Sequence, residues 1–116
     1  MTPAEFKALQ KPKASKYRSK PIVVDGVRFD SQAEARRHGE LTLMQRAGEI
    51  SDLARQVPFD LQVNGHHIAR YVADHVYTKD GERVVEDTKG VATPVYKIKR
   101  SLMTALHGVK IVEVRR

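Results

Sequence analysis

The sequence contains no cysteine and no long apolar run. Without cysteine there can be no disulfide, thiolate zinc site or cysteine nucleophile, whereas oxygen-ligated ions such as Mg²⁺ or Mn²⁺ remain compatible with the composition. A membrane span needs roughly 20 apolar residues and a secretory signal needs a shorter apolar core, and neither pattern is present. We therefore expect a soluble protein of the cytoplasm with no membrane segment.

What the sequence does contain is an excess of positive charge. The chain has 116 residues, of which 41% are apolar, and a formal net charge of +7. This length predicts one domain, over residues 21–116. Residues 1–20 hold six lysine or arginine residues against one glutamate, a charge of +5, and few large apolar side chains. We expect a flexible tail that contacts nucleic-acid phosphates or serves only as a solvated terminus. The tail's candidate DNA contacts are Lys13, Lys16, Arg18 and Lys20.

Turn and cap signals divide the domain into elements. A short hairpin arm is predicted over residues 22–29, turning at Asp25-Gly26. Ser31 is placed to cap a helix that runs to about Ala47, with Leu41, Met44 and Ala47 as its apolar stripe. Glu34 occupies the capping-box position of this helix, but it also lies on nearly the same face as Leu41. Its carboxylate has either role, as a cap or as a group directed at whatever the helix packs upon.

Three strands, a helix and a fourth strand follow. A three-stranded antiparallel meander is predicted over residues 54–62, 67–78 and 83–89, with turns at Asn64-Gly65 and Asp80-Gly81. Pro58 indicates an interruption, a bulge or an edge position in the first of these strands. The second helix should begin at Thr93-Pro94 and end at Gly108, before a last strand over residues 109–114. Its predicted buried stripe comprises Val95, Ile98, Leu102 and Leu106.

The segment VVEDTKG in the third strand of the meander carries the most informative pattern. Strand alternation puts Asp87 and Lys89 on one face and Glu86 on the other. The preceding strand holds Asp74 within mostly apolar sequence, which is typical of a central strand. A tight turn makes the two strands neighbours, so we expect Asp74 to lie close to Asp87.

Two neighbouring carboxylates in a partly buried sheet repel each other unless a proton or a cation lies between them. Mg²⁺ meets this requirement, and it keeps waters that can take part in phosphodiester hydrolysis. Lys89, on the same face, could hold the attacking water or neutralise developing charge. The alternative is a surface Asp–Lys pair worth less than about 1 kcal/mol, with Asp74 at a strand end.

This pattern resembles the PD-(D/E)XK nucleases, which have the restriction-endonuclease-like fold. Asp74 corresponds to their first metal-binding aspartate, Asp87 to the acid of the (Asp/Glu)-x-Lys element, and Lys89 to its lysine. Glu34 looks like the additional glutamate that many members contribute to the metal site. The segments FDSQAEARR, YVAD and VEDTKG are also similar to those of small phage-encoded nuclease-like proteins. The resemblance covers about residues 27–114.

The resemblance implies an α/β fold with a mixed central sheet flanked by helices. It also implies a Mg²⁺-dependent endonuclease, in which Asp74, Asp87 and Glu34 hold Mg²⁺ or Mn²⁺ and Lys89 orients the attacking water. The substrate would be duplex or branched DNA, and members typically leave 5′-phosphate ends. A phage-encoded member would act in the host cell cytoplasm. The alternative function is a non-catalytic nucleic-acid-binding module on the same fold, in which the basic tail does the binding.

Other polar residues have two interpretations each. Gln56, Lys97 and Arg100 could contact DNA, or they could be solvated side chains of a strand and a helix. Structural roles are favoured for the histidines and tyrosines of the meander and the second helix. These histidines and tyrosines are His66, His67, His75, Tyr71, Tyr77 and Tyr96.

A homodimer would allow both strands of a duplex to be cut, and the arm over residues 22–29 could mediate it.

Overall fold

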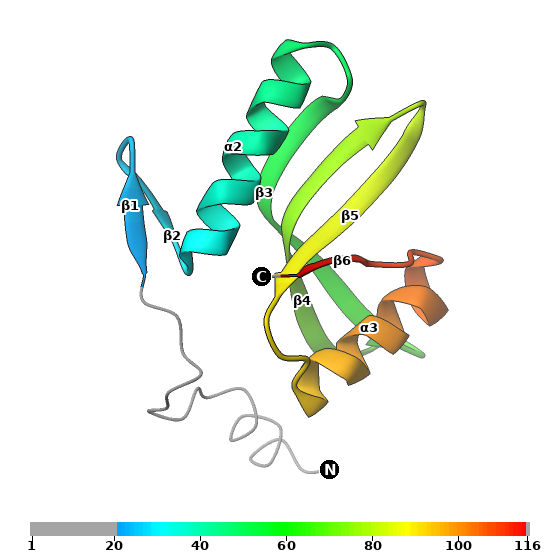
Figure 1. Ribbon diagram of the computed structural model, residues 1–116. Helices are drawn as coiled ribbons and strands as arrows, with labels where there is room; N and C mark the ends of the chain where they lie inside the picture. Colours follow the sequence, from blue (N-terminus) through cyan, green and yellow to red (C-terminus); the bar gives the residue numbers. More distant parts are fainter. Residues whose placement is uncertain (1–20, 116) are drawn as a thin grey trace.

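The computed structural model describes residues 21–115, so the four candidate DNA contacts of the tail, at positions 13, 16, 18 and 20, lie outside the described residues. The elements follow the predicted order of arm, helix, three strands, helix and strand (Figure 1). They are β1 (Ile22–Val24), β2 (Val27–Phe29), α2 (Gln32–Arg46), β3 (Ser51–Val63), β4 (His66–Lys79), β5 (Glu82–Lys89), α3 (Pro94–His107) and β6 (Val112–Arg115). No helix among residues 21–115 is long and apolar enough to span a membrane.

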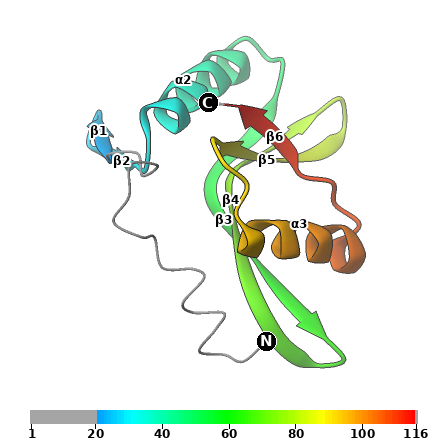
Figure 2. The ribbon, with the colours of Figure 1, turned by 60° about the horizontal axis from the view of Figure 1, so that its bottom comes forward.

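A mixed four-stranded sheet forms the centre of this α/β fold. Its strand order is β3-β4-β5-β6, in which β6 runs parallel to β5 and the other neighbours are antiparallel. The crossover to β6 passes through α3, as a parallel connection requires. Figure 2 shows α2 and α3 on the two sides of β5 and β6. The β1–β2 arm is a separate sheet beyond α2 (Figure 1).

The local signals that predicted these elements act as expected. Ser31 Oγ accepts a hydrogen bond from the Glu34 amide at 3.1 Å, and Thr93 Oγ1 accepts one from the Tyr96 amide at 3.1 Å. The turn between β3 and β4 has φ values of 51° at Asn64 and 78° at Gly65. Positive φ at both positions is what a two-residue hairpin turn needs, and asparagine followed by glycine supplies it.

One detail of α2 differs from the sequence predictions, and the structure selects one of the alternatives that the sequence left open for Pro58. Leu41 of the predicted α2 stripe is buried and Met44 is half-buried, but Ala47 is exposed at the helix end. β3 runs through Pro58, which pairs with Val72, and its register shifts lie elsewhere. Proline fits here because β3 is an edge strand of the sheet, one of the three alternatives that the sequence left open.

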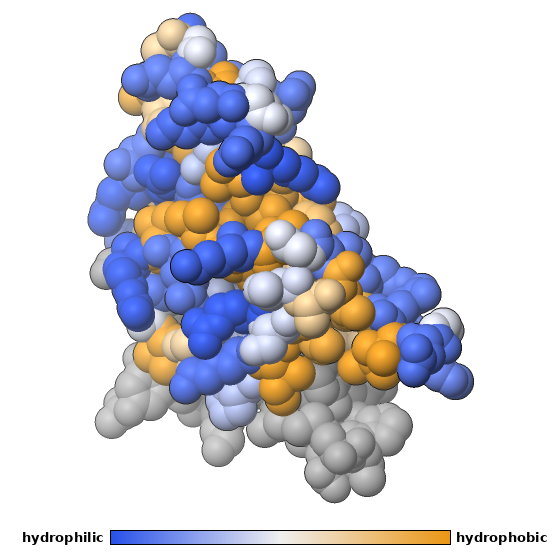
Figure 3. Space-filling model, turned by 90° about the vertical axis from the view of Figure 1, so that its right-hand side faces the viewer, coloured by the Kyte–Doolittle hydropathy of each residue, from blue (hydrophilic) through white to orange (hydrophobic). Residues whose placement is uncertain are grey.

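The predicted buried stripe of α3 is partly wrong. Ile98 and Leu106 are 39% and 38% exposed, whereas Tyr96 and Met103 are buried. The helix is rotated because the tyrosine ring and the methionine fill the space beside β3 and β4, so the neighbouring aliphatic residues lie at the rim. Figure 3 shows apolar side chains among hydrophilic ones on the side of the molecule that it presents.

Two hydrophobic clusters hold the helices to the sheet. The smaller cluster joins α2 to the strands through Leu41, Ile50 and Tyr77. The larger cluster joins α3 and the segment before β6 to β5 and the β3–β4 hairpin. Its buried members are Phe59, Leu61, Ala69, Tyr71, Ala73, Val76, Val85, Tyr96, Met103 and Ile111.

Side-chain alternation changes face in the middle of the β3–β4 hairpin. Ala73 and Val76 both pack in the larger cluster although they are three positions apart, and Tyr77 packs in the smaller one. Regular alternation would place the side chains of Ala73 and Tyr77 on the same face of the sheet. Opposite this point, Gln56 of β3 has a φ of 51°, a left-handed conformation that is rare for a residue with a side chain. Asp74 lies at this break.

Replacing Leu61, which is 0% exposed, by alanine should lower the free energy of unfolding by about 2–5 kcal/mol, because it opens a cavity between β3 and α3. Val63→Ala is the matched control, since Val63 is 38% exposed in the same strand and should cost less than about 1 kcal/mol. Urea unfolding followed by circular dichroism measures both values. An equal loss of unfolding free energy in the two variants would contradict the assignment of Leu61 to the core.

Candidate active site

Asp87 of β5 is a buried carboxylate with two partners on its own face of the sheet. Its Oδ2 atom accepts a hydrogen bond from the Tyr71 hydroxyl at 3.1 Å and lies 3.4 Å from Nζ of Lys89. Lys89 Nζ also lies 4.4 Å from the centre of the Tyr96 ring, a cation–π contact with α3. The predicted pairing of Asp87 with Lys89 is therefore present, and Tyr96 fixes the lysine in place.

Asp74 lies beside Asp87, as the sequence predicted. The β4–β5 ladder pairs His75 with Glu86, and the next step along this register brings Asp74 opposite Asp87. Asp74 Oδ2 accepts a hydrogen bond from the Thr88 amide at 2.8 Å, so the main chain of β5 orients this carboxylate. The two carboxyl groups are close enough to share a proton.

This contact has a strong electrostatic effect. Burial and the adjacent Asp74 raise the pKa of Asp87 to about 8, while Lys89 and the Tyr71 hydroxyl lower it. Near neutral pH the pair therefore carries one negative charge rather than two unless a cation replaces the proton. A site of this kind is able to exchange a proton for a metal ion.

Glu34 of α2 is 3% exposed, and its carboxylate is already engaged by other groups. One oxygen accepts the Asp30 amide at 3.3 Å, and the other accepts Gln56 Nε2 at 3.1 Å and lies 3.5 Å from Arg55 Nη2. Burial, Asp74 and Asp30 raise the pKa of Glu34. The capping-box bond from Glu34 back to the Ser31 amide does not form, since Glu34 binds the amide one residue earlier.

The three predicted metal ligands do not all converge. Asp74 and Asp87 meet, and Glu34 is near enough to feel the charge of Asp74. Within residues 21–115, however, no three acidic or histidine side chains form a group that could hold a metal ion. Two neighbouring carboxylates fit Mg²⁺ or Mn²⁺, because these ions are held by one or two carboxylates and keep several waters. Glu34 would have to release Gln56 and Arg55 to join them.

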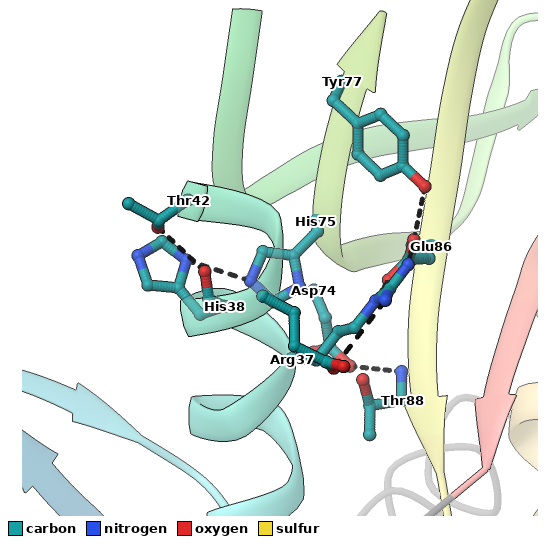
Figure 4. A network of polar contacts seen from close by, with 9 residues as sticks. Arg37, His38, Thr42, Asp74, His75, Tyr77, Glu86 and Thr88 are labelled. Atoms are coloured by element: carbon teal, nitrogen blue, oxygen red, sulfur yellow. Dashed lines mark hydrogen bonds and ion pairs between the residues drawn. The ribbon is translucent and has the colours of Figure 1, made fainter. Parts of the chain in front are cut away.

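The opposite face of β5 carries a second buried acid with a different partner. Glu86 is 1% exposed and receives two hydrogen bonds from Arg37 of α2, at 2.8 Å and 2.9 Å, and one from the Tyr77 hydroxyl at 2.5 Å (Figure 4). Burial raises the pKa of Glu86, but the hydrogen bonds from Arg37 and Tyr77, together with the charge of Arg37, bring that pKa below its usual value. The Arg37–Glu86 ion pair thus fixes α2 to the strand that bears Asp87 and Lys89.

His75 faces α2 rather than Asp87, which agrees with the structural role expected for it. It is fully buried, and its Nε2 atom lies 3.2 Å from Nδ1 of His38 (Figure 4). Burial and the nearby His38 lower the pKa of His75 to about 4, so the ring is neutral near pH 7. His66 and His67 lie at the exposed start of β4, away from the acidic pair.

The predicted DNA contacts of the domain have different surroundings. Lys97 is exposed, whereas Arg100 is ion-paired with Glu113 at 3.0 Å. Lys99 is near enough to Lys89 that burial and the lysine's positive charge lower the pKa of Lys99.

Tyr71 is a site residue whose role the sequence did not predict. We expected only packing from it, yet its hydroxyl donates to Asp87. The signal was its position three residues before Asp74, but strand alternation alone would not direct Tyr71 and Asp74 to one site. The change of face at Asp74 brings them together.

Arg37→Met should destabilise the fold by about 3–5 kcal/mol, because it leaves the buried Glu86 carboxylate without its cation. The double variant Arg37→Met, Glu86→Met should recover most of this loss, since it removes both charges. Arg36→Met, one residue away and exposed, is the control and should change stability by less than about 1 kcal/mol. Urea midpoints measure all three, and a double variant as unstable as the single one would contradict the assigned role.

Comparisons with known proteins give a family but no activity. The family described as "Protein of unknown function (DUF1064)" matches residues 14–115. No curated protein matches the sequence. Any function must therefore be argued from the site.

Proposed function

Because the chain belongs to the DUF1064 family, whose description assigns no activity, we propose from the site that the protein is a metal-dependent endonuclease that hydrolyses DNA phosphodiester bonds. One observation carries this proposal. Asp74 and Asp87 meet on adjacent strands, and the ammonium of Lys89 lies 3.4 Å from Asp87. A carboxylate pair that favours a cation, with a fixed lysine beside it, suits the attack of water on a phosphodiester.

The order and position of the elements support the same proposal. Similarity to the PD-(D/E)XK nucleases rests on an acid-bearing helix, a strand with Asp74, a hairpin, and a strand with Asp87 and Lys89. The four-stranded mixed sheet with one helix on each side is compatible with their core. The balance of positive charge, with a formal net charge of +7, favours a polyanionic substrate.

Each site residue has a definite role in this proposal. Asp74 and Asp87 would hold Mg²⁺ or Mn²⁺, which when bound polarises a phosphate oxygen and makes a nearby water more acidic. Lys89, held between Asp87 and the Tyr96 ring, donates a hydrogen bond to the attacking water or to a phosphate oxygen. Tyr71 keeps the Asp87 carboxylate oriented.

Less direct roles complete the proposal. Glu34 would act as a third acid after exchanging its present partners. Lys97, Gln56 and the tail would position the DNA backbone without reading sequence, and Arg100 would join them by leaving Glu113. The host cell cytoplasm is the expected location if the gene is carried by a phage. Self-association through the β1–β2 arm stays a prediction.

Asp87→Asn should reduce DNA cleavage by at least about a thousandfold, because it removes a metal ligand while leaving a side chain of the same shape. DNA affinity should stay within a few-fold of the wild type, since binding depends on the basic residues. Glu82→Gln, an exposed acid in the same strand, is the matched control and should cut normally. The assay uses linear, nicked, single-stranded and four-way DNA with Mg²⁺ or Mn²⁺, and EDTA should stop cleavage.

A wild-type protein that binds these DNAs but cuts none of them would refute the enzymatic proposal. That result would favour a non-catalytic nucleic-acid-binding module. The engagement of Glu34 by Gln56 and Arg55 is the feature of the site that suits such a module. Cleavage of RNA in place of DNA would keep the chemistry and change the substrate.

Metal binding should also be visible without catalysis. Mn²⁺ at about 100 times its Kd should stabilise the wild type by about 2.7 kcal/mol, and the midpoint of thermal unfolding should rise accordingly. In EDTA, Asp74→Asn should be at least as stable as the wild type, because its amide can donate a hydrogen bond to Asp87 where the acid pair has to hold a proton. The same variant should gain little from Mn²⁺. An equal gain in both proteins would place the metal elsewhere.

A further inference from the structure

A pocket of about 190 Å³ opens between the β1–β2 arm, α2 and β3. Its lining comprises Arg28, Asp30, Glu34, Arg55 and Gln56. This volume equals that of about six liquid waters, and it is smaller than the roughly 300–1,000 Å³ of sites that enclose a complete drug-sized ligand. A group of one ring system, larger than a single ion, fits such a space.

The charges of the lining favour a neutral polar group over a phosphate. Two arginines face two carboxylates, and one of these pairs is formed directly, with Arg55 Nη2 3.5 Å from Glu34. A phosphate would gain from the arginines but would be repelled by Glu34 and Asp30. A nucleobase presents donors and acceptors on its edges without a net charge, so it matches a lining of both kinds.

Arg55 forms a rigid flat wall of this pocket. Its guanidinium lies 4.2 Å from the centre of the Phe29 ring, and Nη2 donates to the Arg28 carbonyl at 3.0 Å. These contacts, with Glu34, fix the plane of the guanidinium before any ligand arrives. Its Nε atom is buried and has no hydrogen-bond partner among the described residues. Bases stack on arginine planes of this kind in nucleic-acid complexes.

We propose that this pocket is a subsite for one unpaired nucleobase of the DNA, which stacks on Arg55 while its edge meets Arg28 and Asp30. The inference rests on the proposed function, which supplies DNA as the ligand. Gln56 and Glu34 join the pocket to the acidic pair, because Gln56 binds Glu34 and Glu34 lies near Asp74. An unpaired base in the pocket would place its own backbone phosphate beside Asp74 and Asp87. Paired bases are disfavoured because leaving the duplex costs them a few kcal/mol.

The test compares the affinity of the full-length protein for three short DNA duplexes by fluorescence anisotropy, in EDTA so that no cleavage occurs. One duplex is fully paired, the second carries one unpaired base, and the third carries an abasic nucleotide at that position. The wild type should bind the duplex with the unpaired base about fivefold or more tightly than either of the others, the gain expected for one stacked base. The abasic duplex separates base recognition from a simple preference for bent DNA.

Arg28→Ala and Asp30→Ala should reduce this preference to less than about twofold, since both side chains are exposed and line the pocket. Arg36→Ala is the control, because it removes an exposed arginine of α2 that does not line the pocket, and it should keep the full preference. Circular dichroism verifies that each variant is folded.

Equal binding of the abasic duplex, or an undiminished preference in both pocket variants, would overturn the subsite. Cleavage with Mg²⁺ tests the proposed function separately. A wild type that prefers the unpaired base but cuts no DNA would retain the subsite and lose the nuclease. A wild type that cuts paired DNA but shows no preference for the unpaired base would retain the nuclease and lose the subsite.

Discussion

The requirement that β4 serve two hydrophobic clusters shapes most of this protein. The first half of β4, up to Ala73, packs against α3, and its far end packs against α2 through Tyr77. The direction of its side chains must therefore change between Ala73 and Val76. The neighbouring strand accommodates the change at Gln56 through a left-handed conformation, at a cost of about 1–3 kcal/mol. The acidic pair, Glu34 and the pocket all adjoin this break, since Asp74 lies at it and Gln56 both binds Glu34 and lines the pocket.

β5 shows two solutions to the burial of a carboxylate in adjacent positions. Glu86 faces α2 and is neutralised by a bidentate arginine. Asp87 faces the other way and meets another acid, Asp74, while Lys89 lies 3.4 Å away. The first arrangement stabilises the position of the strand, and the second leaves a charge that an incoming cation can satisfy. Such a contrast between neighbours is typical of a site supported by a rigid scaffold.

Much of the fold followed from local sequence signals. Serine and threonine caps, proline at a helix start, and Asn-Gly and Asp-Gly turns act over three or four residues, and each of them placed an element end within a few residues. The pairing of Asp74 with Asp87 was also predictable, because one tight turn sets the register between their strands. The rotation of α3, the engagement of Glu34 and the hydroxyl contact of Tyr71 were not. These features depend on volumes and angles between elements that are distant in the sequence. Regular strand alternation also fails at the break beside Gln56, so it could not predict which side chains of β4 share a face.

The separation in sequence between the partners of each contact bears on the order in which the site assembles. Asp74 and Asp87 are joined by a single hairpin, whereas Arg37 and Glu86 are 49 residues apart. Closing a short loop costs less entropy than closing a long one, so we expect the hairpin to form before α2 docks. The two acids would then come together in a folding intermediate that is still open to solvent, where water screens their repulsion. The later docking of α2 and α3 excludes that water, and the proton or cation between the acids becomes part of the final folding step.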